Sequence, residues 1–477
     1  MRNADPILAA IETHGPDFVA LADRIWDHPE IAWTEFRASD AHAAMLERHG
    51  FRVERGIAGL PTALSGERGA EGPVIAFLGE YDALPGLSQA AGVAEEAPLV
   101  AGGEGHGCGH NLLGTGALLA AVALAEWLEA AGLPGRVRYY GCPAEESEAG
   151  KTYMVREGVF ADVDAAFSWH PSSFTRIDPN GGLAMGVVDF HFSGRAAHAA
   201  GMPHLGRSAL DAVELMNVGS NYLREHIPPG AKLHYAILDG GGPAPNIVQA
   251  RAAVRYAVRD RELAGMTRLL ERVRKVAEGA SMMTETTMRM QVAAGYSDMI
   301  LIDSLSHVLQ AAAERLGPVP FDDADRDFAA RIQASLPAEN VANDYVRAGL
   351  PDAKGQSLTD CIVPLDAPAA PMIGSTDLGD VSWVVPLAEI LVATQAIGTP
   401  GHSWQMVAQG KAPAAHKGML HAAAIMATAA RDLIADPALL SRVKADHTAR
   451  LDGQPYLCPI PPDVKPPVRP RPASPGR

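Results

Sequence analysis

The amino-acid sequence predicts an α/β fold of two parts, in which helices flank a central mixed sheet and a smaller α+β domain is inserted into the larger one. Three observations lead to this prediction. Short apolar strands alternate with helical patterns at both ends of the chain. The residues after these strands are rich in histidine, cysteine and glutamate, and the middle of the chain has a strand–helix order of its own. With 477 residues, the chain is long enough for two or three domains.

The larger domain is expected in two segments, residues 1–182 and 301–458. Apolar residues recur at helical spacing through residues 6–50, which predicts two packed helices. A longer apolar run, Leu112–Leu128, predicts a buried helix. Four short apolar segments predict the strands of the sheet, at Val74–Leu78, Val137–Tyr140, Ala165–Trp169 and Ile390–Ile397.

The inserted domain is expected over residues 183–300. Alternating apolar residues predict strands, and helical spacing predicts two helices between them. In chain order these elements are a strand at 185–193, a helix at 206–224, strands at 232–238 and 250–259, a helix at 263–277 and a strand at 284–292. The order β-α-β-β-α-β is the ferredoxin-like arrangement.

Two further segments lack a repeating pattern. Residues 318–375 show little periodicity, and an irregular segment of this length in a compact domain is usually functional or mobile. Residues 459–477 contain eight prolines in 19 positions, so we expect a mostly unstructured tail.

Composition narrows the classes of protein and of partner. The net charge of −16 argues against nucleic acid, because a phosphate backbone attracts basic proteins. The four cysteines form no CxxC pair, which fits a reducing compartment better than a disulfide scaffold. The N-terminal segment shows no secretory signal, and the apolar run at 112–125 is shorter than the roughly 20 residues that span a bilayer. We therefore expect a cytoplasmic enzyme with no membrane or nucleic-acid partner.

Side chains that can bind a metal or move a proton gather at the ends of the predicted strands. The loop Gly-His-Gly-Cys-Gly-His-Asn at 105–111 places Cys108 and His110 on one side of an extended segment, and thiolate and imidazole suit zinc and related metals. Taken singly, each such residue also reads as a buried cysteine, a solvated carboxylate or a packed histidine. Strand ends of an α/β sheet nevertheless meet where ligands bind, and two metal ions that act on a carbonyl need several ligands. The residues so placed are Asp82, Cys108, His110, Glu145, Glu146, His170 and His402.

Together with other motifs, these residues resemble the M20 metallopeptidases, in their amidohydrolase branch. The resemblance covers nearly the whole chain. It rests on Trp-Asp-His-Pro-Glu at 26–30, Glu-Tyr-Asp-Ala-Leu-Pro at 80–85, the loop at 105–111, Pro-Ala-Glu-Glu at 143–146, Trp-His-Pro at 169–171, Gly-Arg-Ala-Ala-His at 194–198 and Gly-His-Ser-Trp at 401–404. It implies a dinuclear-metal catalytic domain and an inserted domain that serves as a lid and a dimer interface.

The resemblance also implies a role for each residue of the cluster. Glu145 matches the catalytic base, and Asp82 matches the acid that orients a metal ligand from behind. Glu80 stands where peptidase branches carry a metal-binding histidine, so this position departs from their pattern. Two divalent ions, Zn²⁺ or Mn²⁺, are implied, and their ligands are Cys108, His110, Glu146, His170 and His402.

Four residues of the inserted domain are candidates for contact with substrate. His198 matches a lid histidine that reaches the active site of the partner subunit, and Asn246 matches a lid residue that contacts substrate. Arg207 and Arg259 are candidates for binding a carboxylate, because a guanidinium fork matches that group. Arg207 reads equally well as a residue that solvates the start of a helix, and the sequence does not rank the arginines.

The expected function is hydrolysis of the amide bond of an N-acyl amino acid, with Glu145 moving a proton from metal-activated water to the leaving amine. The resemblance favours p-aminobenzoyl-glutamate as the substrate. A dipeptidase or a hydrolase of another conjugate is one alternative, and a non-catalytic subunit of a two-subunit amidohydrolase is the other. The expected assembly is a homodimer through the lid domain, or a pair with a related subunit.

Overall fold

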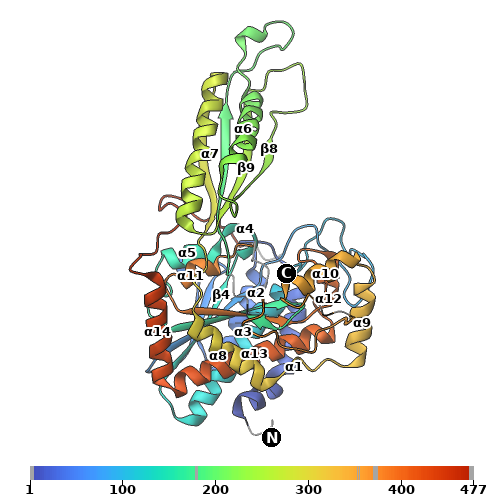
Figure 1. Ribbon diagram of the computed structural model, residues 1–477, viewed down its shortest axis with the longest axis vertical. Helices are drawn as coiled ribbons and strands as arrows, with labels where there is room; N and C mark the ends of the chain where they lie inside the picture. The colour runs from blue at the N-terminus through green and yellow to red at the C-terminus, as the bar shows by residue number, and fades with distance from the viewer. Residues whose placement is uncertain (1–4, 178–180, 352, 354, 369–373, 472–477) are drawn as a thin grey trace, which may run out of the picture.

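The computed structural model describes residues 5–177, 181–351, 353, 355–368 and 374–471. It contains a large body built on a seven-stranded sheet and a narrower part, built on a four-stranded sheet, that projects from it (Figure 1). The predicted mixed α/β fold, with helices flanking a central mixed sheet, is confirmed.

The seven-stranded sheet has the order β1-β2-β4-β3-β5-β11-β6. Its four central strands, β4, β3, β5 and β11, are parallel to one another, and the outer strands pair antiparallel. The bounds are β1 Arg52–Arg55, β2 Leu64–Gly69, β3 Val74–Glu80, β4 Arg136–Cys142, β5 Ala165–Ser172, β6 Arg176–Ile177 and β11 Leu387–Ala393.

Helices cover both faces of this sheet, which explains why its central strands are apolar throughout. Every residue of β3 is buried; Ile75 and Phe77 pack in one core with α1, α3 and α13, whereas Val74, Ala76 and Leu78 pack in a second core on the other face. The helices of the body are α1 Pro6–Trp26, α2 Phe36–Arg48, α3 His110–Ala131, α4 Glu145–Glu148, α5 Gly150–Arg156, α8 Asp303–Leu316, α9 Asp323–Gln333, α10 Ala338–Arg347, α11 Leu378–Ser382, α12 Trp404–Gln409, α13 Pro413–Ala435 and α14 Pro437–Leu451.

Helix α3 is the central helix of the larger core. It is long and apolar enough to cross a membrane, but 89% of its most apolar stretch is buried inside the fold. It lies against α1 and α13, so the predicted buried helix at 112–128 is confirmed. Its first residue, His110, places one end of this helix at the predicted site.

The projecting part has the strand order β10-β7-β9-β8, with all pairs antiparallel. Helices α6 and α7 pack against each other and against this sheet (Figure 1). The elements are β7 Ala184–Ser193, α6 Ala209–Leu223, β8 Lys232–Asp239, β9 Arg251–Asp260, α7 Leu263–Thr284 and β10 Thr287–Tyr296. Chain order and strand order are those of a ferredoxin-like unit; its function as a lid stays a prediction.

The expectation of an irregular segment at 318–375 is wrong for part of that range. Helices α9 and α10 lie within it. Asp322 and Asp325 form a reciprocal capping box at the start of α9, which is a recognisable helix signal. Apolar residues recur at helical spacing in both helices, but few of them are fully buried. Strand β5 also runs to Ser172, so His170 lies within a strand rather than after it.

The C-terminal tail differs from the unstructured segment that its prolines suggested. Over 459–471 it forms no helix or strand, yet Ile460 is 1% exposed and packs in the second core. Arg156 donates a hydrogen bond to the Val464 carbonyl at 2.9 Å, and Arg471 pairs with Asp40 at 2.7 Å. Proline prevents regular backbone pairing but leaves the side chains and carbonyls free to pack along the surface.

Candidate metal centre

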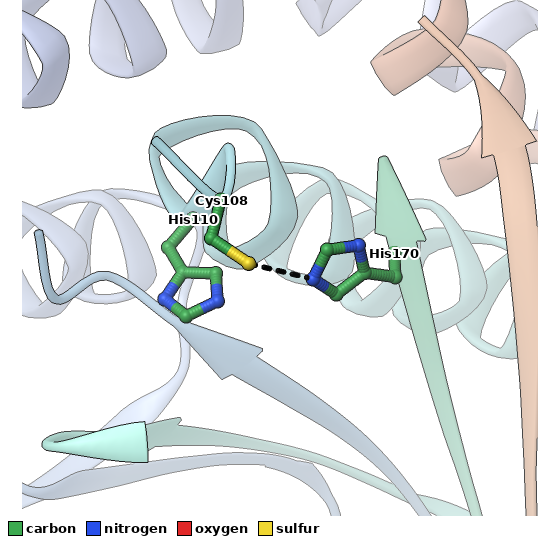
Figure 2. A group of neighbouring side chains, drawn as sticks. All are labelled: Cys108, His110 and His170. Carbon is green, nitrogen blue, oxygen red and sulfur yellow. Dashed lines mark hydrogen bonds between the residues drawn. The ribbon is translucent and has the colours of Figure 1, made fainter. Parts of the chain in front are cut away.

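The glycine-rich loop before α3 brings Cys108 and His110 to the carboxyl ends of the parallel strands. Gly109 has a φ of +79°, and a Cβ there would lie 2.9 Å from side-chain atoms of Met406 and Pro171, so only glycine fits this turn. Figure 2 shows the result: the Cys108 sulfur lies 3.3 Å from Nε2 of His170, with the His110 ring beside it.

Hydrogen bonds on the far side of each imidazole fix its orientation. His110 Nδ1 donates to Asp82 Oδ1 at 2.9 Å, and His170 Nδ1 donates to the Pro171 carbonyl at 2.9 Å. Each bond leaves Nε2 free to face the centre of the cluster. Asp82 also accepts the backbone N–H of Glu146 through Oδ2 at 2.9 Å, so one buried carboxylate aligns both residues.

The two glutamates follow β4 in a short turn. Ala144 and Ala149, on either side of α4, both have left-handed φ values, +58° and +55°. Glu146 Oε2 lies 3.3 Å from Nε2 of His402. Glu145 lines the adjoining cavity, and burial, followed by the charges of Glu80 and Asp377, raises the pKa of its carboxyl well above its ordinary value.

This donor set fits a divalent transition metal. One ligand atom from each of Cys108, His110 and His170 lies within 4.8 Å of the others, and Cys108 forms a second such group with Glu146 and His402. Oε1 of Glu146 is buried without a hydrogen-bond partner among the described residues and lies 3.9 Å from Nε2 of His110. A buried polar atom without a partner is costly, and a cation between these two side chains would give it one.

The pKa shifts of two of the ligands, Cys108 and His170, are compatible with a bound cation. Burial, followed by the charge of Glu146, raises the pKa of the Cys108 thiol, so the thiolate needs a nearby cation. Burial, followed by the charge of His110, lowers the pKa of His170, which keeps this imidazole neutral, the form that binds metal.

A buried charge network that the sequence did not reveal lies next to these ligands. The Lys151 ammonium is fully buried and lies 2.5 Å from Glu80 Oε1 and 2.5 Å from Asp377 Oδ1. The other Glu80 oxygen lies 3.1 Å from Nε2 of His110. Glu80 therefore joins the Lys151 ammonium and the His110 ring in one buried network.

The cluster opens into a cavity of about 410 Å³, within the range of small-molecule sites. Arg259 of β9 and Tyr296 of β10 line it from the projecting part. Arg259 donates to the Ser375 hydroxyl at 3.0 Å. Of the four predicted substrate-contact residues, this arginine is the one whose side chain lines the cavity.

The other three lie elsewhere on the projecting part. The side chains of His198 and Asn246 are exposed. The two residues lie close together, because the N–H of Ala199 donates to the Asn246 carbonyl and His198 forms a β-bridge with Ile247. Arg207 is paired with Glu285 at 2.9 Å and donates to the Gly206 carbonyl. The reading of Arg207 as a structural residue therefore fits its contacts better than a role in the cavity.

Comparison with known proteins decides the family. The model of peptidase family M20/M25/M40 matches residues 76–327, which is more than half of the chain. The chain belongs to this family. M20 membership makes it a hydrolase of amide bonds and supports the use of divalent metal. The resemblance found from the motifs is thus confirmed.

Relatives within the M20 family cover almost the whole chain. The chain is 44% identical over 467 residues to a subunit of the p-aminobenzoyl-glutamate hydrolase of Escherichia coli, covering 96% of this chain and 97% of that protein. It is 29% identical over 472 residues to the Xaa-Arg dipeptidase of Mus musculus, covering 96% and 94%. A dinuclear metal-binding M20 peptidase from Bacillus subtilis has the same fold, with a TM-score of 0.55, 17% identity, and 87% and 99% of the two chains covered.

Proposed function

We propose that this protein is a metal-dependent amidohydrolase that cleaves p-aminobenzoyl-glutamate into p-aminobenzoate and glutamate. One observation carries the proposal: four ligand-type side chains, Glu145 and an arginine line one cavity, and the fifth ligand-type side chain, His110, clusters with two of the four. The name of the relative with 44% identity supports the choice of substrate.

In the proposed site, Cys108, His110, Glu146, His170 and His402 would hold two divalent ions, Zn²⁺ or Mn²⁺. When bound, such ions polarise the amide carbonyl and make water acidic enough to lose a proton near neutral pH. Glu145 would accept a proton from the attacking water and pass it to the nitrogen of the leaving amine. Asp82 keeps His110 and the Glu146 backbone in place throughout.

Arg259 is proposed to bind a carboxylate of the glutamate moiety. Its side chain lines the same cavity as Cys108, Glu146, His170 and His402, and it is partly buried, so an anion there would be shielded from water. The fork of an arginine matches a carboxylate in two hydrogen bonds. The aromatic acyl group would then lie on the other side of the scissile bond.

The protein is proposed to work as a dimer through the projecting part. Strand β8 is an edge strand of its sheet, and nearly all of its residues are exposed. Apolar side chains on β8 and on the neighbouring helix α6 are exposed to solvent, as an interface would require; they are Leu215, Val218, Tyr222, Tyr235, Ile237 and Leu238. Pairing two copies would carry His198 and Asn246 toward the site of the partner.

Subunit mixing tests this dimer. Glu145→Gln and His198→Ala should each be inactive alone, because one lacks the base and the other lacks the donor from the partner. After subunit exchange, mixed dimers hold one intact site, so roughly a quarter of the parental activity should return. If exchange restores nothing, or if His198→Ala is active by itself, the shared site is refuted.

Two alternatives stay compatible with the family. The similarity to Xaa-Arg dipeptidase favours a dipeptidase as the first of them. A non-catalytic subunit is the second, but here both glutamates and every proposed ligand are present, and all of them except the buried His110 line one cavity. A cytoplasmic location remains part of the proposal.

Hydrolysis by the purified chain alone tests the proposed function. The protein is stripped of metal, reloaded with Mn²⁺ or Zn²⁺ and given p-aminobenzoyl-glutamate, and the release of glutamate is followed. Release that depends on metal supports the enzyme class and the substrate. Absence of release, together with cleavage of an Xaa-Arg dipeptide, would replace the substrate proposal with the first alternative.

A further inference from the structure

A second cluster of metal-binding side chains lies far from the catalytic site. It consists of His14 on α1, His49 at the C-terminal end of α2 and Glu126 near the end of α3. One ligand atom from each side chain lies within 4.8 Å of the others. Glu126 is 16 residues along α3 from His110, which is about 24 Å along a helix axis, so this cluster is separate from the catalytic metals.

The contacts within the cluster bring three possible ligand atoms close together. Nε2 of His14 lies 2.9 Å from Oε1 of Glu126. The two imidazole rings meet edge to face, with centroids 4.7 Å apart. Nε2 of His49 is buried and has no hydrogen-bond partner among the described residues. A metal ion would replace the proton shared by His14 and Glu126 and would give the His49 nitrogen a partner.

The charges around the cluster do not oppose a cation strongly. Arg68 donates to the His49 carbonyl at 3.0 Å, but its guanidinium is paired with Glu129. Arg48 is paired with Asp17 at 2.6 Å. Burial, followed by the charge of His14, lowers the pKa of His49, so this imidazole is neutral and ready to bind near neutral pH.

We propose that His14, His49 and Glu126 form a second metal site, specific for Zn²⁺-like transition metals, that clamps three helices together. Two imidazoles and a carboxylate are the donors that zinc accepts, and partial exposure of the cluster leaves a position for water. The ion would join α1, the end of α2 and α3, which pack together in the main core. Its role is structural, because it lies outside the catalytic cavity.

Zinc stoichiometry tests this site in the full chain. The parent, the double variant His14→Gln/His49→Gln and the control His307→Gln are dialysed against the same buffered Zn²⁺, and bound zinc is measured. His307 is an exposed histidine on α8 and belongs to neither cluster. We expect the parent and the control to bind one equivalent more than the double variant, with equal hydrolytic activity in all three. Equal stoichiometry in all three overturns the proposal.

A milder variant keeps the test decisive if the double variant does not fold. Glu126→Gln keeps an acceptor for His14 and removes the carboxylate charge. This variant should lower the affinity for the additional zinc ion by more than about 10-fold. Even the loss of a residue that is only hydrogen-bonded to a ligand lowers metal affinity by about 10–100-fold. Zinc should also raise the unfolding temperature of the parent more than that of this variant. Unchanged affinity and an unchanged shift would overturn the proposal.

Discussion

Glu35 Oε1 accepts a hydrogen bond from the backbone N–H of Ala144 at 2.9 Å, one residue before Glu145. Glu35 is fully buried, and Ala144 has the left-handed φ of +58° that residues with a side chain rarely adopt. The bond therefore stabilises the strained turn that points Glu145 into the cavity. Asp82 supports the other side of the same turn through the N–H of Glu146.

Replacing Glu35 should lower turnover without removing metal. Glu35→Leu deletes the acceptor, and misplacing Glu145 by about 1 Å would lower kcat by up to about 100-fold. Glu35→Gln keeps the acceptor oxygen and should retain most of the activity. Steady-state kinetics with metal analysis checks both variants. A folded Glu35→Leu enzyme with parental kcat would show that the turn does not need this bond.

Glu35 should also make stability depend on pH. Burial, followed by the charge of Asp82, raises the pKa of its carboxyl from 4.5 to about 8. Because the folded protein then holds a proton that the unfolded chain has released, the contribution of Glu35 to folding is fully present below pH 4.5 and is lost as pH rises to about 8. The free energy of unfolding of Glu35→Gln, relative to the parent, should therefore increase across this window. A constant difference would contradict the raised pKa.

The buried Lys151 should be essential for stability. Lys151→Met would leave the carboxylates of Glu80 and Asp377 without their shared cation, and breaking a buried ion pair from one side costs roughly 3–5 kcal/mol. Lys444→Met is the matched control, because Lys444 pairs with Asp164 at 2.5 Å while its side chain is 53% exposed, and such surface pairs contribute about 0–1 kcal/mol. Chemical denaturation compares the two. If both variants lost a similar amount of unfolding free energy, burial of the Lys151 ion pairs would not be the reason for their contribution.

Arg259 should determine the affinity for a substrate carboxylate. Losing a charge-assisted hydrogen bond costs about 1.5–3 kcal/mol, so Arg259→Ala should raise KM for p-aminobenzoyl-glutamate by roughly 10-fold or more. Arg255→Ala is the control, because Arg255 lies on the same strand but pairs with Asp189 at 2.7 Å. Amide analogues that lack carboxylates should not distinguish Arg259→Ala from the parent. An equal loss for these analogues would assign Arg259 a structural role.

Much of the fold was predictable because its strands and helices have strong apolar patterns. The parallel strands are apolar on both faces, and the elements of the inserted unit alternate clearly, so the four central strands of the large sheet and all four strands of the smaller one could be predicted. The outer strands β1, β2 and β6 were not predicted. Helices α9 and α10 were missed because they are short and rich in charged and polar residues, although their few apolar residues do recur at helical spacing. The packing of the tail was not predicted, because a high proline content indicates that the backbone forms no regular hydrogen-bonded structure but does not show whether the side chains pack.

The candidate site was predictable where its chemistry is carried by distinctive residues at strand ends. Cys108, His170 and His402 do come together with the two glutamates. Glu35 and Lys151 were missed because a single charged residue in sequence looks like a surface residue, and only the fold shows that it is buried. At the start of α9, the capping box formed by Asp322 and Asp325 is a sequence signal for a helix.

The most direct test of the central claim is a comparison of Glu145→Gln with the parent for three quantities: bound metal, substrate affinity and turnover. If Glu145 is the base beside a metal centre held by its neighbours, the variant should bind the same metal and bind p-aminobenzoyl-glutamate with similar affinity. Its turnover should fall by about 10²–10⁴-fold, the usual contribution of a general base. Turnover close to that of the parent, with metal bound, would contradict the account.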